Sequence, residues 1–276
     1  MGKQTGGFTI IETMLFLGIS GILIVGLLAG TGVTIGIQRY RDSVETFKSF
    51  LQGQYSELSS VRNDRDKGWT CDQNGATSVT ASPGDGINPG QSECVFVGRY
   101  VSITDDKVAV YSVTARKITN PANLLATDTA IDKIAKKYNF NIASGTKEES
   151  TLEWGARIAW PQAGKDSKTA GTSRSIAFLF LRSPDTGEIY TFNSSSAPGT
   201  VTPASLRAMI VNGLNDPGQG ERTLCIDSNG STLGADQSIF FYSAASGPSS
   251  IETRSDDYID GLDGRVDGIT PVTCQV

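Results

Sequence analysis

Histidine is absent from this chain of 276 residues, and its absence removes a large part of enzyme chemistry. Histidine is the commonest general base and a member of most nucleophile–base triads. The four cysteines form no CxxC pair, and a mixed cysteine–histidine zinc site is excluded because the chain has no histidine. The sequence also contains neither a phosphate-binding glycine loop nor a G-x-S-x-G motif. We therefore expect a protein that is not an enzyme.

Charge is almost absent from the first part of the chain. Between Phe8 and Ile37 the only ionised side chain is Glu12. A helix over this run would be about 45 Å long, which exceeds the ~30 Å hydrocarbon core of a bilayer. A carboxylate inside such a span costs a few kcal/mol, so its presence predicts a functional role. Small residues in the run fit helices that approach one another closely: Gly18, Gly21, Gly26, Gly30, Gly32 and Gly36.

Two simpler interpretations of this run exist. An ordinary secretory signal peptide also has a basic start and an apolar stretch, but that stretch is only ~7–15 residues long. The run here is about twice that length, and the small residues at 28–30 are followed by more apolar sequence. A plain membrane anchor is the second alternative, and it gives no reason for an acidic residue at position 12.

The start of the run carries a motif, Lys3–Leu15 (KQTGGFTIIETML), that resembles the leader of type IV pilins and type II secretion pseudopilins. The resemblance implies a leader of residues 1–7, cut between Gly7 and Phe8 by the prepilin peptidase and methyltransferase, with N-methylation of Phe8. Glu12 then matches the glutamate that the family has at the fifth position of the mature chain. The motif bears on export and assembly, and not on the role of the rest of the chain.

The resemblance also implies a role for Glu12. As a filament grows, each subunit leaves the bilayer and its helix joins a central bundle. The Glu12 carboxylate would pair there with the free amine of Phe8 on a neighbouring subunit, and low dielectric strengthens such a charge-assisted bond. The implied partners are other pilin subunits, the peptidase, an inner-membrane assembly platform and, before assembly, membrane lipid. The expected location is a single pass through the cytoplasmic (inner) membrane, then an extracellular or periplasmic filament, with the head outside the cytoplasm.

After the apolar half of the helix (8–37), the sequence turns polar but keeps helical spacing over 38–62. Apolar residues recur at three- and four-residue steps, with charged residues between them. This pattern predicts one continuous helix from Phe8 to Arg62, whose second half packs on a globular head. The expected packing face consists of Tyr40, Val44, Phe47, Leu51, Tyr55, Leu58 and Val61.

The remaining residues, 63–276, suffice for one domain with a core, and they read mainly as strands. We expect an α+β protein with the type IV pilin fold, in which the long helix packs on an antiparallel β head, one form being a two-sheet sandwich. A second helix is predicted at Thr127–Tyr138, and turns at 105–106 and 185–187. The predicted strands are Val95–Ile103, Lys107–Ala115, Leu152–Trp160, Ser175–Arg182, Glu188–Phe192, Leu206–Val211, Arg222–Asp227 and Ser238–Ser243.

The head is similar, more weakly, to the GspH/FimT family of minor pilins and pseudopilins. The similarity rests on the order of strands and on the segment Arg222–Gly230, RTLCIDSNG. That family has a β-sandwich head of two sheets, and relative to it regions 197–220 and 246–270 look like insertions. A large head with insertions argues against a major pilin, because a repeated subunit must tile densely.

An even number of cysteines in an exported head predicts two disulfides, for which three pairings are possible. We favour pairing of nearest neighbours, Cys71 with Cys94 and Cys225 with Cys274. A disulfide-bounded loop near the C-terminus is also common in pilins, which supports the second pair. Four reduced, buried thiols are the alternative, and they would suit a cytoplasmic head.

Aspartates and glycines are concentrated in the segment 256–268, and they offer hard oxygen ligands on a bendable loop, as Ca²⁺ requires. The candidate ligands are Asp257, Asp260 and Asp263. The spacing does not match an EF-hand, and some pseudopilins have a calcium loop at the C-terminus. The alternative is a solvated acidic loop with no cofactor at all.

DNA binding is the rival function, because some related minor pilins act as DNA receptors. Phosphate contact needs basic residues gathered on one face, whereas this chain has a net charge of −5. The candidate cluster is Arg174, Arg182, Arg207 and Arg222. Our prediction from the sequence is therefore a minor pilin or pseudopilin that contributes to filament assembly, priming or tip display. The alternatives are a filament-borne receptor for DNA or a cell surface, and a major pilin.

Overall fold

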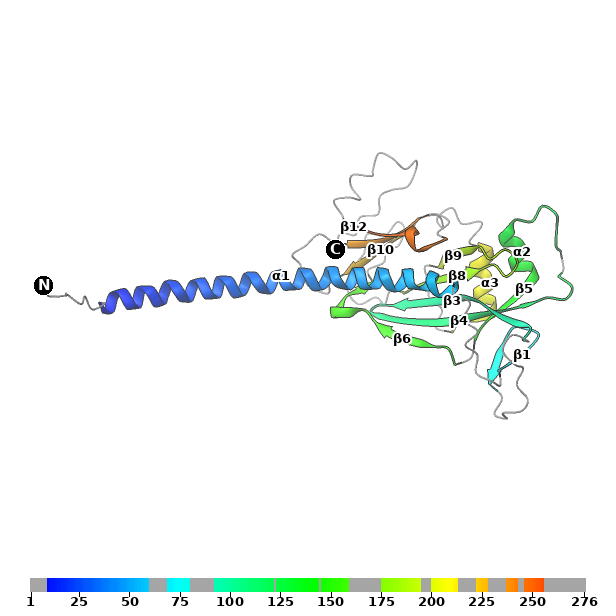
Figure 1. Cartoon of the computed structure of the whole chain (residues 1–276), viewed down its shortest axis with the longest axis horizontal. Helices are drawn as coiled ribbons and strands as arrows, with labels where there is room; N and C mark the ends of the chain where they lie inside the picture. The colour runs from blue at the N-terminus through cyan, green and yellow to red at the C-terminus, as the bar shows by residue number, and fades with distance from the viewer. Residues whose placement is uncertain are drawn as a thin grey trace.

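The computed structural model of the chain is an α+β protein in which one long helix extends far beyond a β-rich head (Figure 1). The helix, α1, runs from Ile10 to Ser59, and its second half packs on antiparallel sheets. This arrangement confirms the predicted α+β class and the continuous helix within the described residues. The structure describes residues 9–59, 69–79, 92–121, 123–143, 145–158, 175–194, 200–212, 222–227, 237–242 and 246–255.

The described part of the head has two larger sheets and one two-stranded sheet, and every described pairing is antiparallel. The six-stranded sheet has the order β5-β4-β3-β8-β9, with β6 also paired to β4. Its strands are β3 (Cys94–Thr104), β4 (Lys107–Lys117), β5 (Tyr138–Ile142), β6 (Glu148–Thr151), β8 (Ser175–Arg182) and β9 (Ile189–Ser194). The four-stranded sheet has the order β12 (Ile251–Ser255), β11 (Gln237–Phe241), β10 (Arg222–Asp227) and β7 (Arg157–Ile158).

Smaller elements complete the head. A separate hairpin pairs β1 (Trp69–Cys71) with β2 (Thr77–Val79). Two short helices, α2 (Ala130–Lys137) and α3 (Pro203–Asn212), lie at the end of the head farthest from the N-terminus (Figure 1). Two 3-10 turns, η1 (Glu153–Gly155) and η2 (Pro248–Ser250), both contact α1.

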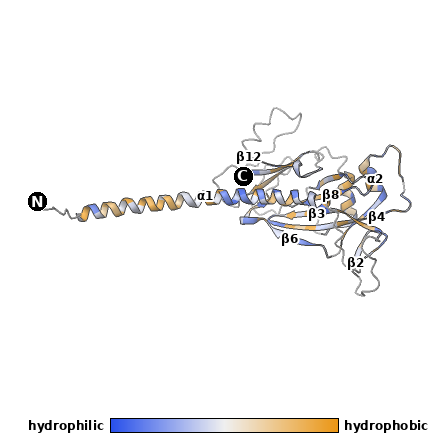
Figure 2. Cartoon of the chain, in the orientation of Figure 1, coloured by the Kyte–Doolittle hydropathy of each residue, from blue (hydrophilic) through white to orange (hydrophobic). Residues whose placement is uncertain are grey.

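The two halves of α1 meet different surroundings, as Figure 2 shows by the change from apolar to polar colouring along the helix. The second half buries one stripe of side chains against the head, at the three- and four-residue steps that place them on one face. This confirms the predicted face except for Val61, which lies outside the described residues, and Leu58 is partly buried. The buried residues are Tyr40, Ser43, Val44, Phe47, Leu51, Gln54 and Tyr55.

The six-stranded sheet is covered on both faces, and β8 shows this most clearly. Alternate side chains of a strand point to opposite faces, so Ile176–Leu181 are all buried because both faces are occupied, while Ser175 and Arg182 at the two ends are partly buried. Ile176, Phe178 and Phe180 join a core shared by α1 and both sheets, in which Phe178 stacks on Phe241 of the other sheet at 4.6 Å between ring centroids. The intervening residues join a second core beneath α2 and α3.

The predicted second helix is confirmed but begins later and ends earlier than expected. Thr129 caps α2: its hydroxyl accepts a hydrogen bond from the Asp132 amide, and the Asp132 carboxylate accepts one from the Thr129 amide. The helix ends at Lys137 because Tyr138 has extended backbone angles and begins β5. Ile134 and Tyr138 are buried, and Ile131 is partly buried against the same core.

The predicted strand Leu206–Val211 is wrong, because these residues belong to α3. A start signal for the helix precedes them: Thr202 exchanges hydrogen bonds with Ser205, and Pro203 occupies the first turn. Leu206, Met209 and Ile210 follow helical spacing and bury against the six-stranded sheet. The region 197–220, interpreted as an insertion, thus supplies part of the core.

The predicted strand Leu152–Trp160 is also wrong over most of its described length. Trp154 and Gly155 have φ values of 58° and 74°, in the left-handed region, and they form the turn η1 instead of extended chain. Strand β7 is left with two residues, Arg157–Ile158, and residues 159–160 lie outside the described part. The Ser43 hydroxyl of α1 donates to the Glu153 carbonyl at 2.9 Å and fixes this turn against the long helix.

The other predicted strands are present, with boundaries that differ by a few residues, and so are both turns. Asp105 adopts a φ of 54° between β3 and β4, and Gly187 a φ of 78° between β8 and β9. Sequence patterns missed several short strands, namely β1, β2, β5, β6 and β12. Strand β12 is the edge of the four-stranded sheet, so the second apparent insertion, 246–270, begins within the fold.

The ion pair between Asp185 and Lys137 joins the turn after β8 to the end of α2, and its contribution to stability can be tested. Asp185, in the turn after β8, accepts hydrogen bonds from Lys137 at 2.9 Å and from the Tyr138 hydroxyl at 2.7 Å. The Lys137 bond, followed by the Tyr138 bond, lowers the pKa of Asp185 below its ordinary value of 3.8. A lowered pKa in the folded state adds stability above the unfolded pKa and loses it as the pH falls through the folded pKa.

We predict that Asp185→Asn lowers the Tm at neutral pH, and that the difference from wild type closes as the pH falls below 3.8. Thermal unfolding of the chain in detergent micelles between pH 7 and pH 3 measures this, with about pH 5 as the point where the difference begins to shrink. Asp42→Asn, on an exposed part of α1, is the control. A difference that stays constant across this range would show that the Asp185 charge contributes nothing.

Candidate functional site

The first half of α1 is an apolar surface with no cover among the described residues. Its most apolar stretch of 18 residues contains no buried residue. Apolar side chains are exposed all round the helix, for example Ile10 at 75%, Phe16 at 70% and Leu27 at 68%. A soluble helix hides at least one apolar face, so a helix that is apolar on every side requires lipid or other helices around it. The helix is long and apolar enough to cross a membrane.

Three threonine hydroxyls within this half are satisfied by the helix itself. The hydroxyls of Thr13, Thr31 and Thr34 donate to the backbone carbonyls of Ile10, Leu28 and Gly30, at 2.8–3.0 Å. Unpaired polar groups cost several kcal/mol in hydrocarbon, where no water can bind them. These three threonines therefore fit an apolar environment in spite of their hydroxyls.

The glycines of this half serve no packing purpose within the described chain. A Cβ atom built on Gly18, Gly21, Gly26, Gly30 or Gly32 would meet nothing within 4 Å. Each glycine inside a helix costs about 1 kcal/mol relative to alanine. Gly26 and Gly30 are four residues apart, as are Gly32 and Gly36, and this spacing lets a second helix approach closely. The glycine spacing thus leaves this half of α1 a surface that a second helix can approach closely.

Glu12 has a local partner that the sequence interpretation overlooked. Its carboxylate accepts hydrogen bonds from the Thr9 amide at 3.1 Å and the Thr9 hydroxyl at 3.2 Å, while the Glu12 amide donates to the Thr9 hydroxyl at 3.3 Å. This reciprocal pair is a capping box at the first turn of α1. The signal was visible in the sequence as Thr-x-x-Glu before an apolar run. Glu12 therefore satisfies helix-end amides within its own chain, whatever its role between chains.

The head holds the second half of α1 at several points along its length. The Tyr40 hydroxyl donates to the Ile226 carbonyl and accepts from the Gln237 amide, both at 2.7 Å. Farther along, Gln52 donates to the Pro248 carbonyl at 2.9 Å. The Tyr55 hydroxyl lies 2.8 Å from that of Thr191, and burial raises the pKa of Tyr55 to about 12 in spite of this bond. These contacts fix α1 to both sheets.

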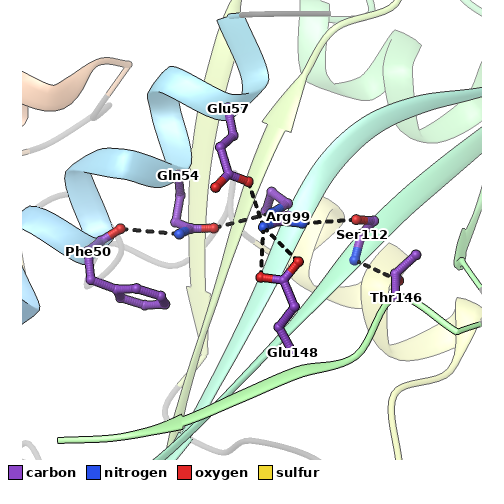
Figure 3. A network of polar contacts seen from close by, with 7 residues as sticks. All are labelled: Phe50, Gln54, Glu57, Arg99, Ser112, Thr146 and Glu148. Atoms are coloured by element: carbon purple, nitrogen blue, oxygen red, sulfur yellow. Dashed lines mark hydrogen bonds and ion pairs between the residues drawn. The ribbon is translucent and has the colours of Figure 1, made fainter. Parts of the chain in front are cut away.

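Arg99 of β3 centres the polar network at the end of α1 (Figure 3). Its guanidinium donates to Gln54 at 3.3 Å and to Ser112 of β4 at 3.1 Å. It also pairs with Glu57 of α1 at 2.5 Å and with Glu148 of β6 at 3.3 Å. The Arg99 side chain is only 12% exposed, whereas the two carboxylates are more than half exposed. One side chain thus joins the helix to three strands.

Disulfide bonds fix a further part of the head. Cys71 of β1 and Cys94 at the start of β3 are bonded, as predicted, with their Cα atoms 5.8 Å apart. The bond ties the β1–β2 hairpin to the six-stranded sheet. Cys225 of β10 is also disulfide-bonded. Its predicted partner, Cys274, lies outside the described residues, so that pairing stays a prediction.

Several predicted site residues lie outside the described part of the chain. These are the processing residues Gly7 and Phe8 and the calcium ligands Asp257, Asp260 and Asp263. Within the described ranges, no group of three or more acidic or cysteine side chains could hold a metal ion.

The candidate arginine cluster can be followed only in part. Arg182 donates to the Leu58 carbonyl of α1 at 3.4 Å, whereas Arg207 is exposed on α3, across the six-stranded sheet. These two arginines therefore do not meet. Arg174 lies outside the described residues, and nothing is described of the Arg222 side chain.

The chain was compared with protein families, characterised proteins and solved structures. The chain matches no protein-family model, no characterised protein and no solved structure.

We predict that Arg99→Met lowers the free energy of unfolding by about 2 kcal/mol, because the buried Gln54 carbonyl group loses its donor. Urea unfolding in detergent micelles measures the change. Glu148→Gln is the matched control: this exposed partner should change stability by no more than about 0.5 kcal/mol. Equal losses in the two variants would mean that the exposed ion pair, and not the buried hydrogen bonds, stabilises this junction.

Proposed function

We propose that this protein is a minor pilin or pseudopilin, a subunit of a type IV-like filament with the type IV pilin fold. The observation that carries the proposal is the exposed apolar half of α1, continuous with a half that is built into the core of the head. Such a helix suits two successive environments, a bilayer before assembly and a bundle of helices from other pilin subunits afterwards. The glycines without intramolecular contacts support the second environment.

The leader motif gives the proposed route to the filament. The prepilin peptidase would cut between Gly7 and Phe8 and methylate the new amine of Phe8, and an inner-membrane platform would then extract the subunit. The cleavage would leave Thr9 and Glu12 at the very start of the mature chain, next to the free amine. Because the carboxylate has more than one acceptor site, it can keep the Thr9 cap and also bind the amine of a neighbouring subunit.

The size of the head favours a minor subunit that primes assembly or is displayed at the tip. Regions 197–220 and 246–270 add α3 and β12 to the layers of the head. A DNA receptor has less support, since the net charge is −5 and Arg182 and Arg207 lie on opposite sides of the six-stranded sheet.

The proposal is tested first by the N-terminal sequence and mass of the native protein from sheared filaments and from membranes. A chain that begins at methylated Phe8 in the sheared fraction is the expected result. A chain that begins at Met1, or beyond residue 29, would overturn the proposal in favour of a plain anchor or a secreted protein.

Glu12 variants separate the charge from the helix cap. Glutamine at this position still accepts the Thr9 hydrogen bonds of a capping box, but it cannot form an ion pair. We therefore predict that Glu12→Gln and Glu12→Ala both leave the subunit in the membrane and both reduce its incorporation into filaments, measured by pull-down of sheared pili.

Thr9→Ala is the matched control for this experiment, because it removes the hydroxyl of the cap and keeps the carboxylate. We expect Thr9→Ala to assemble nearly as well as wild type. If Glu12→Gln assembles normally while Glu12→Ala and Thr9→Ala fail, the glutamate acts only as a helix cap, and pairing between subunits is refuted.

A further inference from the structure

The turn η1 presents an exposed tryptophan at the end of the head nearest to the apolar helix. The Trp154 side chain is 59% exposed, although tryptophan is among the side chains that gain most from burial. Its backbone has a φ of 58°, a left-handed conformation that is an outlier for a bulky residue. Strain of this kind is kept where the surroundings impose it, and it often marks functional positions. The head core gives no reason for it, because Trp154 belongs to neither of the two core clusters.

Two contacts tie Trp154 to the start of the polar half of α1. The guanidinium carbon of Arg39 lies 4.8 Å from the centre of the indole ring, a cation–π distance. The carbonyl of the preceding residue, Glu153, accepts a hydrogen bond from the Ser43 hydroxyl of α1. Arg39 follows the apolar run by two residues, so the indole is held at the level where that run ends.

The length of the helix sets this level relative to a bilayer. From Ile10 to Arg39 the helix rises about 44 Å at ~1.5 Å per residue. A bilayer is ~40–45 Å thick when the headgroup layers are included. With the start of α1 at one face, Arg39 and Trp154 therefore fall within the headgroup layer of the other. Tryptophan is enriched at that layer, where its ring meets lipid and its N–H meets water.

We infer that Trp154, held by Arg39, is an interfacial anchor that seats the base of the head on the phospholipid headgroups before assembly. This inference rests on the membrane stage of the proposed function and adds a lipid contact made by the head itself. Charges of both signs lie next to the indole, since Arg39 stacks on the ring and Glu153 immediately precedes it in the chain. The anchor therefore recognises the headgroup layer of a bilayer in general, and not anionic lipid in particular.

The experiment uses the full chain reconstituted in phosphatidylcholine vesicles, with and without phosphatidylglycerol. Trp69→Phe and Trp160→Phe leave Trp154 as the sole indole, and its emission is quenched with spin-labelled lipids whose label sits near the headgroup or near the bilayer centre. We expect a blue-shifted emission, stronger quenching by the headgroup-proximal label, and the same result in both lipid compositions. Strong quenching by aqueous acrylamide, with none by either lipid, would overturn the inference.

A second variant avoids dependence on the two phenylalanine substitutions. Trp154→Gly suits the left-handed backbone, so the head should fold with an unchanged or raised Tm. The lipid-quenched part of the wild-type emission should be lost in this variant. If that part persists, the quenched emission comes from the other tryptophans and not from Trp154, and the inference fails. The inference also fails if the chain with Trp154 as its sole indole shows the blue shift only in cross-linked oligomers, because the indole then contacts another subunit and not lipid.

Insertion of the helix is checked separately with Leu23→Trp in a chain that also carries Trp154→Gly, Trp69→Phe and Trp160→Phe. Leu23 is 61% exposed and lies about 20 Å along the helix from Ile10 at ~1.5 Å per residue, so a reporter there should be quenched by the label near the bilayer centre. Quenching of this reporter without quenching of Trp154 would refute the anchor and leave the membrane stage intact. Quenching of neither would refute both.

Discussion

The continuity of α1 is the constraint on which the rest of the structure depends. One helix of 50 residues has to be apolar on all sides in its first half and to bury a single stripe in its second. Because no break separates the halves, the head has no freedom to orient itself independently of the apolar segment. The two sheets, the Tyr40 and Arg99 hydrogen bonds and the turn η1 are all arranged around that fixed axis.

The sequence predicted the parts of this fold that follow from strong local periodicity. The helix, the strands β3, β4, β8 and β10, and the first disulfide pair were readable, because each had a long apolar pattern or a nearby partner. Helix α3 resembles a strand in the sequence because Leu206, Ala208 and Ile210 alternate with a period of two, whereas Leu206, Met209 and Ile210 fit the helical period over the same short run. The Thr202–Ser205 cap is the local signal that favours the helix. Strands β6 and β12 depend on pairing with distant segments, which no local pattern reveals.

The candidate site was predictable in its residues and less so in its contacts. Glu12 is identifiable from the sequence because it is the one charge in an apolar run. Its hydrogen bond with Thr9 is identifiable only from the Thr-x-x-Glu spacing of a capping box. Arg99 and Trp154 carry no motif at all: the first is defined by the meeting of α1 with three strands, and the second by a left-handed turn. Features of this kind arise from tertiary structure, so a single sequence gives no sign of them.

The hydrogen bonds between α1 and the head have a mechanical consequence. They are spaced along the helix from Tyr40 to Leu58, and β3 and β4 run roughly alongside its axis (Figure 1). A pulling force on the apolar half would act along that axis and load these bonds together in shear. A junction loaded in shear resists rupture better than one whose bonds open one after another. The head is thus attached in the geometry that best transmits tension along the helix.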